Sequence, residues 1–207
     1  MGIAERKERE KEDVRRKILE AAHHLFEAHG YENVTMRAVA DAIEYSTTTI
    51  YHHFENKDAL VEAVCFADYE KLTAAMREQP LPEHPLAKIR AMGRAYAAFG
   101  LANPNHYRFM FMTPGDWKRH VNADELPPGQ AYGFLRSAVV DAIEGGHFAK
   151  IDVDLASQIL WASIHGVVSL LLTYKPEQFP HVPPHADLLD QSMDAALRGL
   201  MASKGDL

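Results

Sequence analysis

The sequence has one cysteine, Cys65, among its 207 residues. A single cysteine cannot form an intramolecular disulfide, so a fold held by internal disulfide bonds is excluded. Cys65 lies in the apolar run AVCFA, where a small buried side chain is more typical than a nucleophile.

Long apolar runs are also absent. No stretch of about twenty uncharged apolar residues is present, which is the length that a membrane-spanning helix requires. Residues 1–17, MGIAERKEREKEDVRRK, are charged where a signal peptide needs an apolar block. We therefore expect a cytoplasmic protein with no membrane partner.

Positive charge is in deficit. The formal net charge is −7, with 22 Lys and Arg against 29 Asp and Glu, and such a surface repels phosphates at long range. Any DNA binding must therefore depend on a local set of well-placed contacts rather than on the overall charge of the protein.

Motifs of catalysis are missing as well. The chain has no HExxH, no GxSxG and no glycine-rich phosphate loop. We expect no enzyme, no cofactor and no metal site. Adjacent histidines such as His52–His53 or His23–His24 point about 100° apart on a helix, whereas helical metal pairs lie three or four residues apart.

What the chain does have is apolar residues at helical spacing, as in Ile18, Ala22 and Phe26, without the alternation of strands. Hydrophobic residues make up 47% of the chain, enough for a core. Glycine and proline breakers divide it, so we predict an all-α fold of about nine helices. Their ranges are 11–29, 35–42, 46–53, 57–79, 86–102, 104–112, 128–144, 154–174 and 186–202.

The first three predicted helices have the layout of a helix-turn-helix. Thr35 and Ser46 are plausible N-caps of the second and third helices, whose N-termini are natural phosphate contacts. Ile50 and Phe54, four residues apart, give the third helix one buried face. Its other side chains then point outward and suit base edges, thymine methyl groups and phosphates in a major groove: Thr47, Thr48, Thr49, Tyr51 and His52.

Plainer alternatives stay open for these outward side chains. Tyr51 could be a packing residue with an exposed hydroxyl, and His52 or His53 could be a solvated polar position. The basic arm before residue 18 could reach DNA, or its acid and base pairs at i and i+4 could stabilise an exposed helix. We favour the exposed helix for the arm.

The segment GYENVTMRAVADAIEYSTTTIYHHFENKDAL resembles the DNA-binding domain of TetR-family transcriptional regulators. The resemblance rests on the pair Gly30 and Tyr31, on a threonine before the second helix, and on the spacing of Tyr51, Phe54, Lys57 and Leu60. Two positions depart from the family pattern. Glu44 stands where the turn commonly has glycine, and Thr48 stands where glycine or alanine is frequent.

The resemblance implies a set of DNA contacts. Thr35 and Arg37 would contact phosphate, the third helix would lie in or beside the groove, and Lys57 would hold the backbone from the fourth helix. The predicted DNA-binding residues are Thr35, Arg37, Ser46, Thr47, Thr48, Thr49, Tyr51, His52 and Lys57.

We predict a DNA-binding domain over 1–60 and a second domain over 61–207. The second domain suggests roles in effector sensing and in dimerisation. The segment DLASQILWASIHGVVSLLLTY is apolar around much of its circumference, which indicates burial on two sides. With the last helix it suggests a homodimer through a four-helix bundle, as in the TetR-family plan. The predicted interface residues are Ile164, Val168, Leu171, Leu189, Met193, Leu197 and Leu200.

Trp161, His165 and Gly166 resemble the signature of the WHG type of TetR C-terminal domain, and NPNHYRFMFM resembles its Tyr-Arg segment. His165 could be a hydrogen-bonded core histidine or a pocket residue, and most of the aromatic set could be ordinary core. The predicted effector pocket is Tyr96, Phe99, Tyr107, Met110, Phe111, Trp117, Phe134, Trp161 and His165. Arg94, Arg108 and Arg136 could be paired surface groups or could attract an anionic ligand.

The sequence thus predicts a homodimeric regulator that binds a palindromic double-stranded DNA operator. The family resemblance favours a repressor, and a small-molecule effector would release it by preferring a dimer with badly spaced heads. One rival from another class is an enzyme, such as a histidine-rich metal-dependent hydrolase, which the missing motifs disfavour. Another is an all-α ligand carrier or scaffold that does not bind DNA.

Overall fold

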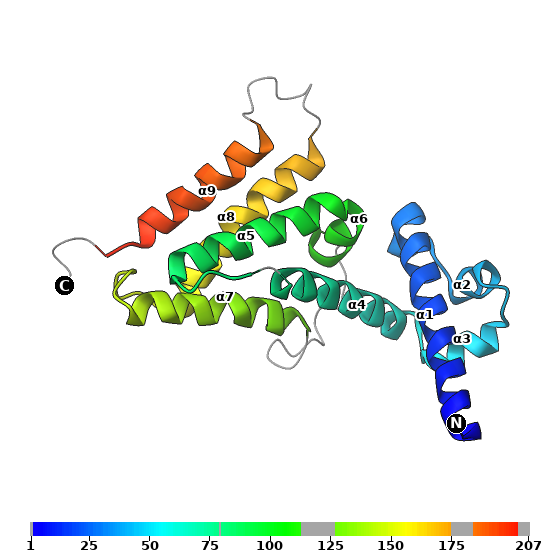
Figure 1. Cartoon of the computed structure of the whole chain (residues 1–207). Coiled ribbons are helices and arrows are strands. Elements are labelled where there is room, and N and C mark those ends of the chain that lie inside the picture. The colour runs from blue at the N-terminus through cyan, green and yellow to red at the C-terminus, as the bar shows by residue number, and fades with distance from the viewer. Residues whose placement is uncertain (1, 79, 113–126, 175–183, 203–207) are drawn as a thin grey trace. The chain divides into compact units, whose positions relative to one another are not determined.

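The computed structural model describes residues 2–78, 80–112, 127–174 and 184–202, and these form α-helices with short connections (Figure 1). No strand occurs in these ranges, so the all-α prediction is confirmed. The elements are α1 (Ile3–His29), the 3-10 turn η1 (Tyr31–Asn33), α2 (Met36–Ala42), α3 (Thr47–His53), α4 (Lys57–Arg77), α5 (Pro85–Ala102), α6 (Pro104–Tyr107), the π-helical turn η2 (Arg108–Met112), α7 (Pro127–Glu144), α8 (Val153–Thr173) and α9 (His185–Leu200).

The chain divides into two compact units. One comprises Met1–Asp68 with Asn105–Asn122, and the other comprises Tyr69–Pro104 with Ala123–Leu207. We call them the head and the body. The head thus includes the segment that begins at Asn105, which the division predicted from the sequence at residue 60 assigned to the second domain.

The head core forms where α1 meets α2 and α3. Ile18, Ala22 and Phe26 recur every four residues along α1, so they lie on one helix face, and all three are buried. Val39 of α2 and Ile50 of α3 are completely buried in the same unit. Two helices of seven residues each are too short to be stable alone, so this shared core is what holds them.

The first helix begins at Ile3, eight residues before the predicted start at 11. Its first turns carry exposed side chains rather than an apolar face, and therefore show no hydrophobic periodicity. Ion pairs join neighbouring turns instead, with Arg6 Nε 2.9 Å from Glu10 Oε1 and Arg16 Nη1 3.2 Å from Glu20 Oε1. These pairs support the interpretation of the arm as an exposed helix.

The body is built around α5, which packs on α7, α8 and α9, while α8 also contacts α7 and α9 (Figure 1). Two ion pairs join α5 to α9. Arg94 donates two hydrogen bonds to Asp190, of 2.9 and 3.1 Å, and Arg90 donates one of 2.7 Å to Asp194. Exposed pairs of this kind contribute about 0–1 kcal/mol, so they orient the helices more than they stabilise them.

Helix α8 is the most apolar element of the body. Of the helices that the structure describes, it alone is long and apolar enough to cross a membrane by length and composition. Its contacts with three other helices of the body are those of a core helix.

The segment predicted as a single helix over 104–112 is a short α-helix, α6, followed by the π turn η2. Tyr107, Phe109 and Met110 are buried along it. The wider π turn changes the direction of the side chains that follow Tyr107, a change that periodicity alone does not predict.

Candidate nucleic-acid interface

The third helix presents a polar row above a buried apolar face. Ile50 and Phe54 are buried in the head, whereas the Tyr51 side chain is 52% exposed. Thr48 and His52 are exposed, and Thr47 and Thr49 are half-buried. No acidic residue occurs in α3, so the row does not repel phosphate although the whole chain is acidic.

Two hydroxyl caps fix where α2 and α3 begin. Thr35 Oγ1 accepts a hydrogen bond of 3.1 Å from the amide of Ala38, and Ser46 Oγ accepts one of 3.2 Å from the amide of Thr49. Both predicted N-caps are confirmed. Because caps use only part of the first turn, other amides at these helix starts stay available to an anion.

Lys57 is held in place at the first residue of α4. Its ammonium lies 4.2 Å from the centre of the Tyr31 ring and donates a hydrogen bond of 3.4 Å to the carbonyl of Glu32. Tyr31 in turn donates a hydrogen bond of 2.6 Å to Asp58. These contacts explain why the pair Gly30 and Tyr31 accompanies the lysine: Gly30, at φ 76°, turns the chain so that the ring reaches α4.

Arg37 is an exposed side chain on α2 whose Nε lies 3.8 Å from the carboxylate of Asp41. A surface pair of this length is weak, so the guanidinium can exchange its partner for a phosphate at little cost. The position of Arg37 is therefore compatible with the predicted phosphate contact.

His53 differs from its neighbour His52. It is half-buried, and burial lowers its pKa, with a further lowering from the positive charges of Lys11 and Arg15. His53 is therefore neutral near pH 7 and packs toward α1. Arg15 lies close by, 4.8 Å above the Phe54 ring.

The turn between α2 and α3 ends in a Schellman motif, in which the amide of Tyr45 bonds to the carbonyl of Ala40 at 3.0 Å and the amide of Glu44 bonds to the carbonyl of Asp41 at 3.3 Å. Glu44 has φ 59°, a left-handed conformation that normally favours glycine. The turn thus adopts a conformation that suits glycine although its residue is glutamate.

In the body, polar side chains follow one edge of α8. Trp161 Nε1 donates a hydrogen bond of 3.3 Å to the hydroxyl of Tyr96, which lies 3.0 Å from His165 Nδ1, and His165 Nε2 lies 3.3 Å from the hydroxyl of Ser169. Burial lowers the pKa of His165, so the ring is neutral at pH 7. Ser169 was not among the predicted residues, although its position four residues after His165 places both on one helix face.

The predicted pocket residues do not all belong to one unit. Tyr96, Phe99, Phe134, Trp161 and His165 lie in the body, whereas Tyr107, Met110 and Phe111 lie in the head. Tyr107 and Met110 are buried, and the Tyr107 and Phe111 rings lie 4.9 Å apart, as in an ordinary aromatic core. Trp117 lies outside the described residues.

The three arginines considered as anion ligands have partners. Arg94 pairs with Asp190, Arg136 donates a hydrogen bond of 2.8 Å to Asp154, and Arg108 donates one of 3.2 Å to the side chain of Asn105. These contacts favour paired surface groups over an anion site.

Most of the predicted dimer residues face inward in the single chain. Five of them are buried within the chain, where they can add no area to an interface: Ile164, Val168, Met193, Leu197 and Leu200. Leu171 and Leu189 are half-buried. The exposed large apolar residues of α8 are instead Leu155, Ile159 and Leu170, with Leu155 53% and Leu170 54% exposed.

The head therefore has the geometry of a helix-turn-helix domain, carried by an all-α body. Comparison with known families agrees: a model described as "Bacterial regulatory proteins, tetR family" matches residues 18–64, and a model described as "Tetracyclin repressor-like, C-terminal domain" matches residues 89–199. The second match covers more than half of the chain, so the protein belongs to the TetR family. Its WHG type stays a prediction.

Curated relatives match mainly in the head. The HTH-type transcriptional regulator UidR of Escherichia coli K12 is 36% identical over 69 residues, which are 33% of this chain and 35% of UidR. The HTH-type transcriptional repressor Rv1474c of Mycobacterium tuberculosis is 39% identical over 67 residues, 32% of this chain and 36% of that protein. The chain thus spans about a third of the length of these relatives.

A solved structure extends the likeness to the whole fold. A putative tetR family transcription regulator from Shewanella sp. PV-4 superposes with a TM-score of 0.73 at 17% identity, covering 91% of this chain and 98% of that one. At this identity the likeness concerns the fold alone.

Proposed function

We propose that the protein is a homodimeric, sequence-specific DNA-binding repressor of the cytoplasm that a small-molecule effector releases from a palindromic operator. The observation that carries the proposal is the exposed polar row of α3, with Tyr51 at its centre, above buried Ile50 and Phe54. A ligand carrier that does not bind DNA would not require an exposed row of polar side chains at this helix. The names of the two curated relatives, a regulator and a repressor, support the same function.

In this proposal, α3 enters the major groove and the capped helix starts contact phosphate. Thr48, Tyr51 and His52 reach base edges and thymine methyl groups, while Arg37 and Lys57 contact the backbone on either side. The first 60 residues carry nine Lys and Arg against twelve Asp and Glu. The affinity for DNA therefore has to come from individual contacts rather than from the net charge of this domain.

The proposed dimer contact is the exposed face of α8. Leu155, Ile159 and Leu170 lie within about 80° of one another around the helix axis, together with Ala162 and Gly166. Small residues at the centre of an apolar stripe allow a second helix to approach closely. Two heads on one face of a duplex would bind half-sites about 34 Å apart.

The effector would bind in the body, where the polar row of Tyr96, Trp161 and His165 gives a helical interior several hydrogen-bonding groups. Release requires only that the effector bind one dimer geometry better than the other. A coupling free energy of about 1 to 3 kcal/mol would weaken operator binding by about five- to 150-fold. The proposed activity is regulatory and includes no catalysis.

The experiment that tests this function is selection from random duplex DNA at moderate salt with the purified protein, followed by sequencing of the retained DNA. We expect a palindromic site. Failure to enrich any sequence with folded protein would refute DNA recognition and favour the carrier.

Two variants then test the residues with the selected operator. Tyr51→Ala should weaken binding and relax sequence preference, whereas Tyr174→Ala, a control on an exposed tyrosine of the body, should not. Lys57→Ala should weaken binding to all sequences and reduce the salt slope by about one, in contrast to Lys150→Ala in the body.

A further inference from the structure

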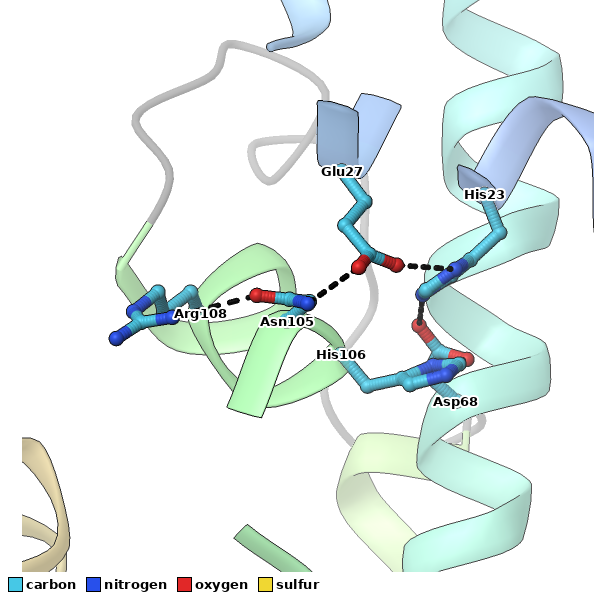
Figure 2. Close-up of polar contacts among 6 residues, drawn as sticks. All are labelled: His23, Glu27, Asp68, Asn105, His106 and Arg108. Atoms are coloured by element: carbon cyan, nitrogen blue, oxygen red, sulfur yellow. Dashed lines mark hydrogen bonds and ion pairs between the residues drawn. The ribbon is translucent and has the colours of Figure 1, made fainter. Parts of the chain in front are cut away.

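Three potential metal ligands converge in the head from three separate elements (Figure 2). His23 comes from α1, Asp68 from α4 and His106 from α6. Each offers one ligand atom, and these atoms lie within 4.8 Å of one another. All three residues belong to the same compact unit, so the cluster does not depend on how the head and the body are placed.

The Asp68 carboxylate lies between the two imidazoles. His106 Nδ1 is 2.6 Å from one carboxylate oxygen, and His23 Nε2 is 3.3 Å from the other. The two rings are stacked with their centres 3.6 Å apart. Two nitrogen atoms therefore point at the same carboxylate from adjacent planes.

The centre of the cluster is buried and negatively charged. Asp68 is 1% exposed and His23 is 8% exposed. Burial by itself would raise the pKa of Asp68, but the imidazoles of His106 and His23 lower it to about 2, so Asp68 is a carboxylate at neutral pH. His23 Nε2 is buried and forms no hydrogen bond with the residues that the structure describes.

A second layer of side chains lies behind His23. Its Nδ1 lies 3.8 Å from the Glu27 carboxylate, which accepts a hydrogen bond from the Asn105 side chain. Asn105 in turn accepts a hydrogen bond of 3.2 Å from Arg108, as Figure 2 shows. A carboxylate behind the far nitrogen of a histidine is the arrangement that fixes the ring and its tautomer in metal sites.

We propose that His23, Asp68 and His106 bind a divalent transition-metal ion of the zinc class. Two imidazole nitrogens and a carboxylate oxygen form a ligand set that such ions accept, with the fourth position left to water. Tetrahedral zinc with bonds of about 2.0–2.2 Å holds its ligand atoms about 3.3 Å apart. The separation of His23 from Asp68 already fits, and His106 has to withdraw from Asp68 by about 0.7 Å.

The alternative cluster of His23, His24 and Glu27 is weaker as a site. All three residues lie on α1, and His24 and Glu27 are exposed. The His23 and His24 rings meet edge to face with their centres 6.1 Å apart. Because this cluster shares His23, the test must separate the two by the residues that they do not share.

Metal binding is independent of the proposed DNA binding and is measured without DNA. Full-length protein without a histidine tag is treated with a chelator, dialysed and titrated with Co²⁺, whose visible absorption is strong in a four-coordinate protein site. We expect saturation at one ion per chain, loss of the signal when Zn²⁺ is added, and a higher melting temperature with metal.

The variants assign the ligands. His106→Gln should weaken Co²⁺ binding at least tenfold with an unchanged far-UV circular dichroism spectrum, and His24→Gln should leave it unchanged. His106→Cys keeps a ligand, so it should bind Co²⁺ with an added thiolate-to-metal absorption band, which a misfolded protein would not give.

Three outcomes would overturn the site. They are the absence of saturable Co²⁺ binding by the native protein, binding that His106→Gln leaves unchanged, and binding that His24→Gln abolishes. In the first case the three residues form only a buried charge cluster. The other two would place the ion on α1 or elsewhere.

Discussion

Replacing Glu44 by glycine should stabilise the protein, an outcome opposite to that of most glycine substitutions. Glu44 has φ 59°, and it is the one non-glycine residue with a positive φ among the described residues. A left-handed conformation costs a residue with a side chain about 1–2 kcal/mol. Glycine removes this cost while keeping the two backbone hydrogen bonds that close the turn.

The gain is reduced by the freedom of glycine in the unfolded chain, which costs about 0.4–1 kcal/mol. The central value of the net increase in the free energy of unfolding is then about 0.8 kcal/mol. For a chain of this size, that corresponds to a melting temperature higher by about 1–4 °C. Urea denaturation followed by far-UV circular dichroism measures the free energy directly.

Glu55→Gly is the matched control, since Glu55 is also exposed and lies between α3 and α4 without a positive φ. It loses the same charge and should lower the free energy of unfolding by about 0.4–1 kcal/mol. If Glu44→Gly lowers it as well, the turn stores no strain and the reasoning from φ fails.

Three further predictions concern the cap, the dimer and pH. Thr35→Ala removes the bond to the amide of Ala38 and should cost about 1 kcal/mol of stability in urea denaturation, whereas Thr35→Ser should keep most of it. Leu170→Glu should raise the dimer dissociation constant at least tenfold in sedimentation velocity, unlike Met112→Glu on an exposed residue of the head, because it buries an unpaired charge. Since burial lowers the pKa of His165 from 6.5, its contribution to stability is complete above about pH 6.5 and falls as the pH drops below it. His165→Gln should flatten that part of a curve of unfolding free energy against pH.

The helices could be predicted because their cores repeat at helical spacing and glycine or proline lies between them. The spacing of Ile18, Ala22 and Phe26 predicted α1. The N-caps Thr35 and Ser46 predicted where α2 and α3 begin. The first turns of α1 escaped prediction because ion pairs, which leave no apolar pattern, join them.

The faces of α8 could not be predicted in the same way. Apolar residues surround much of this helix, so the sequence does not distinguish Val168, which is buried inside the chain, from Leu170, which is exposed. Only the packing of α5, α7 and α9 decides which face of α8 stays exposed.

The cluster of His23, Asp68 and His106 was missed for a different reason. Helical metal pairs show in a sequence as ligands three or four residues apart, and the neighbour of His23 in the sequence is His24. The two companions of His23 come from α4 and α6, and nothing in the spacing of the three residues signals that they meet.

The burial of Cys65 makes the protein convenient for measurements of the two heads. The only thiol of the chain is 2% exposed, so it should react slowly with a maleimide reagent while the protein is folded. A cysteine introduced at an exposed position of the head, as in Glu12→Cys, would then carry the one label of each protomer. In the proposed dimer, two spin labels at that position would report the distance between the heads, and how an added compound changes it, from an otherwise native sequence.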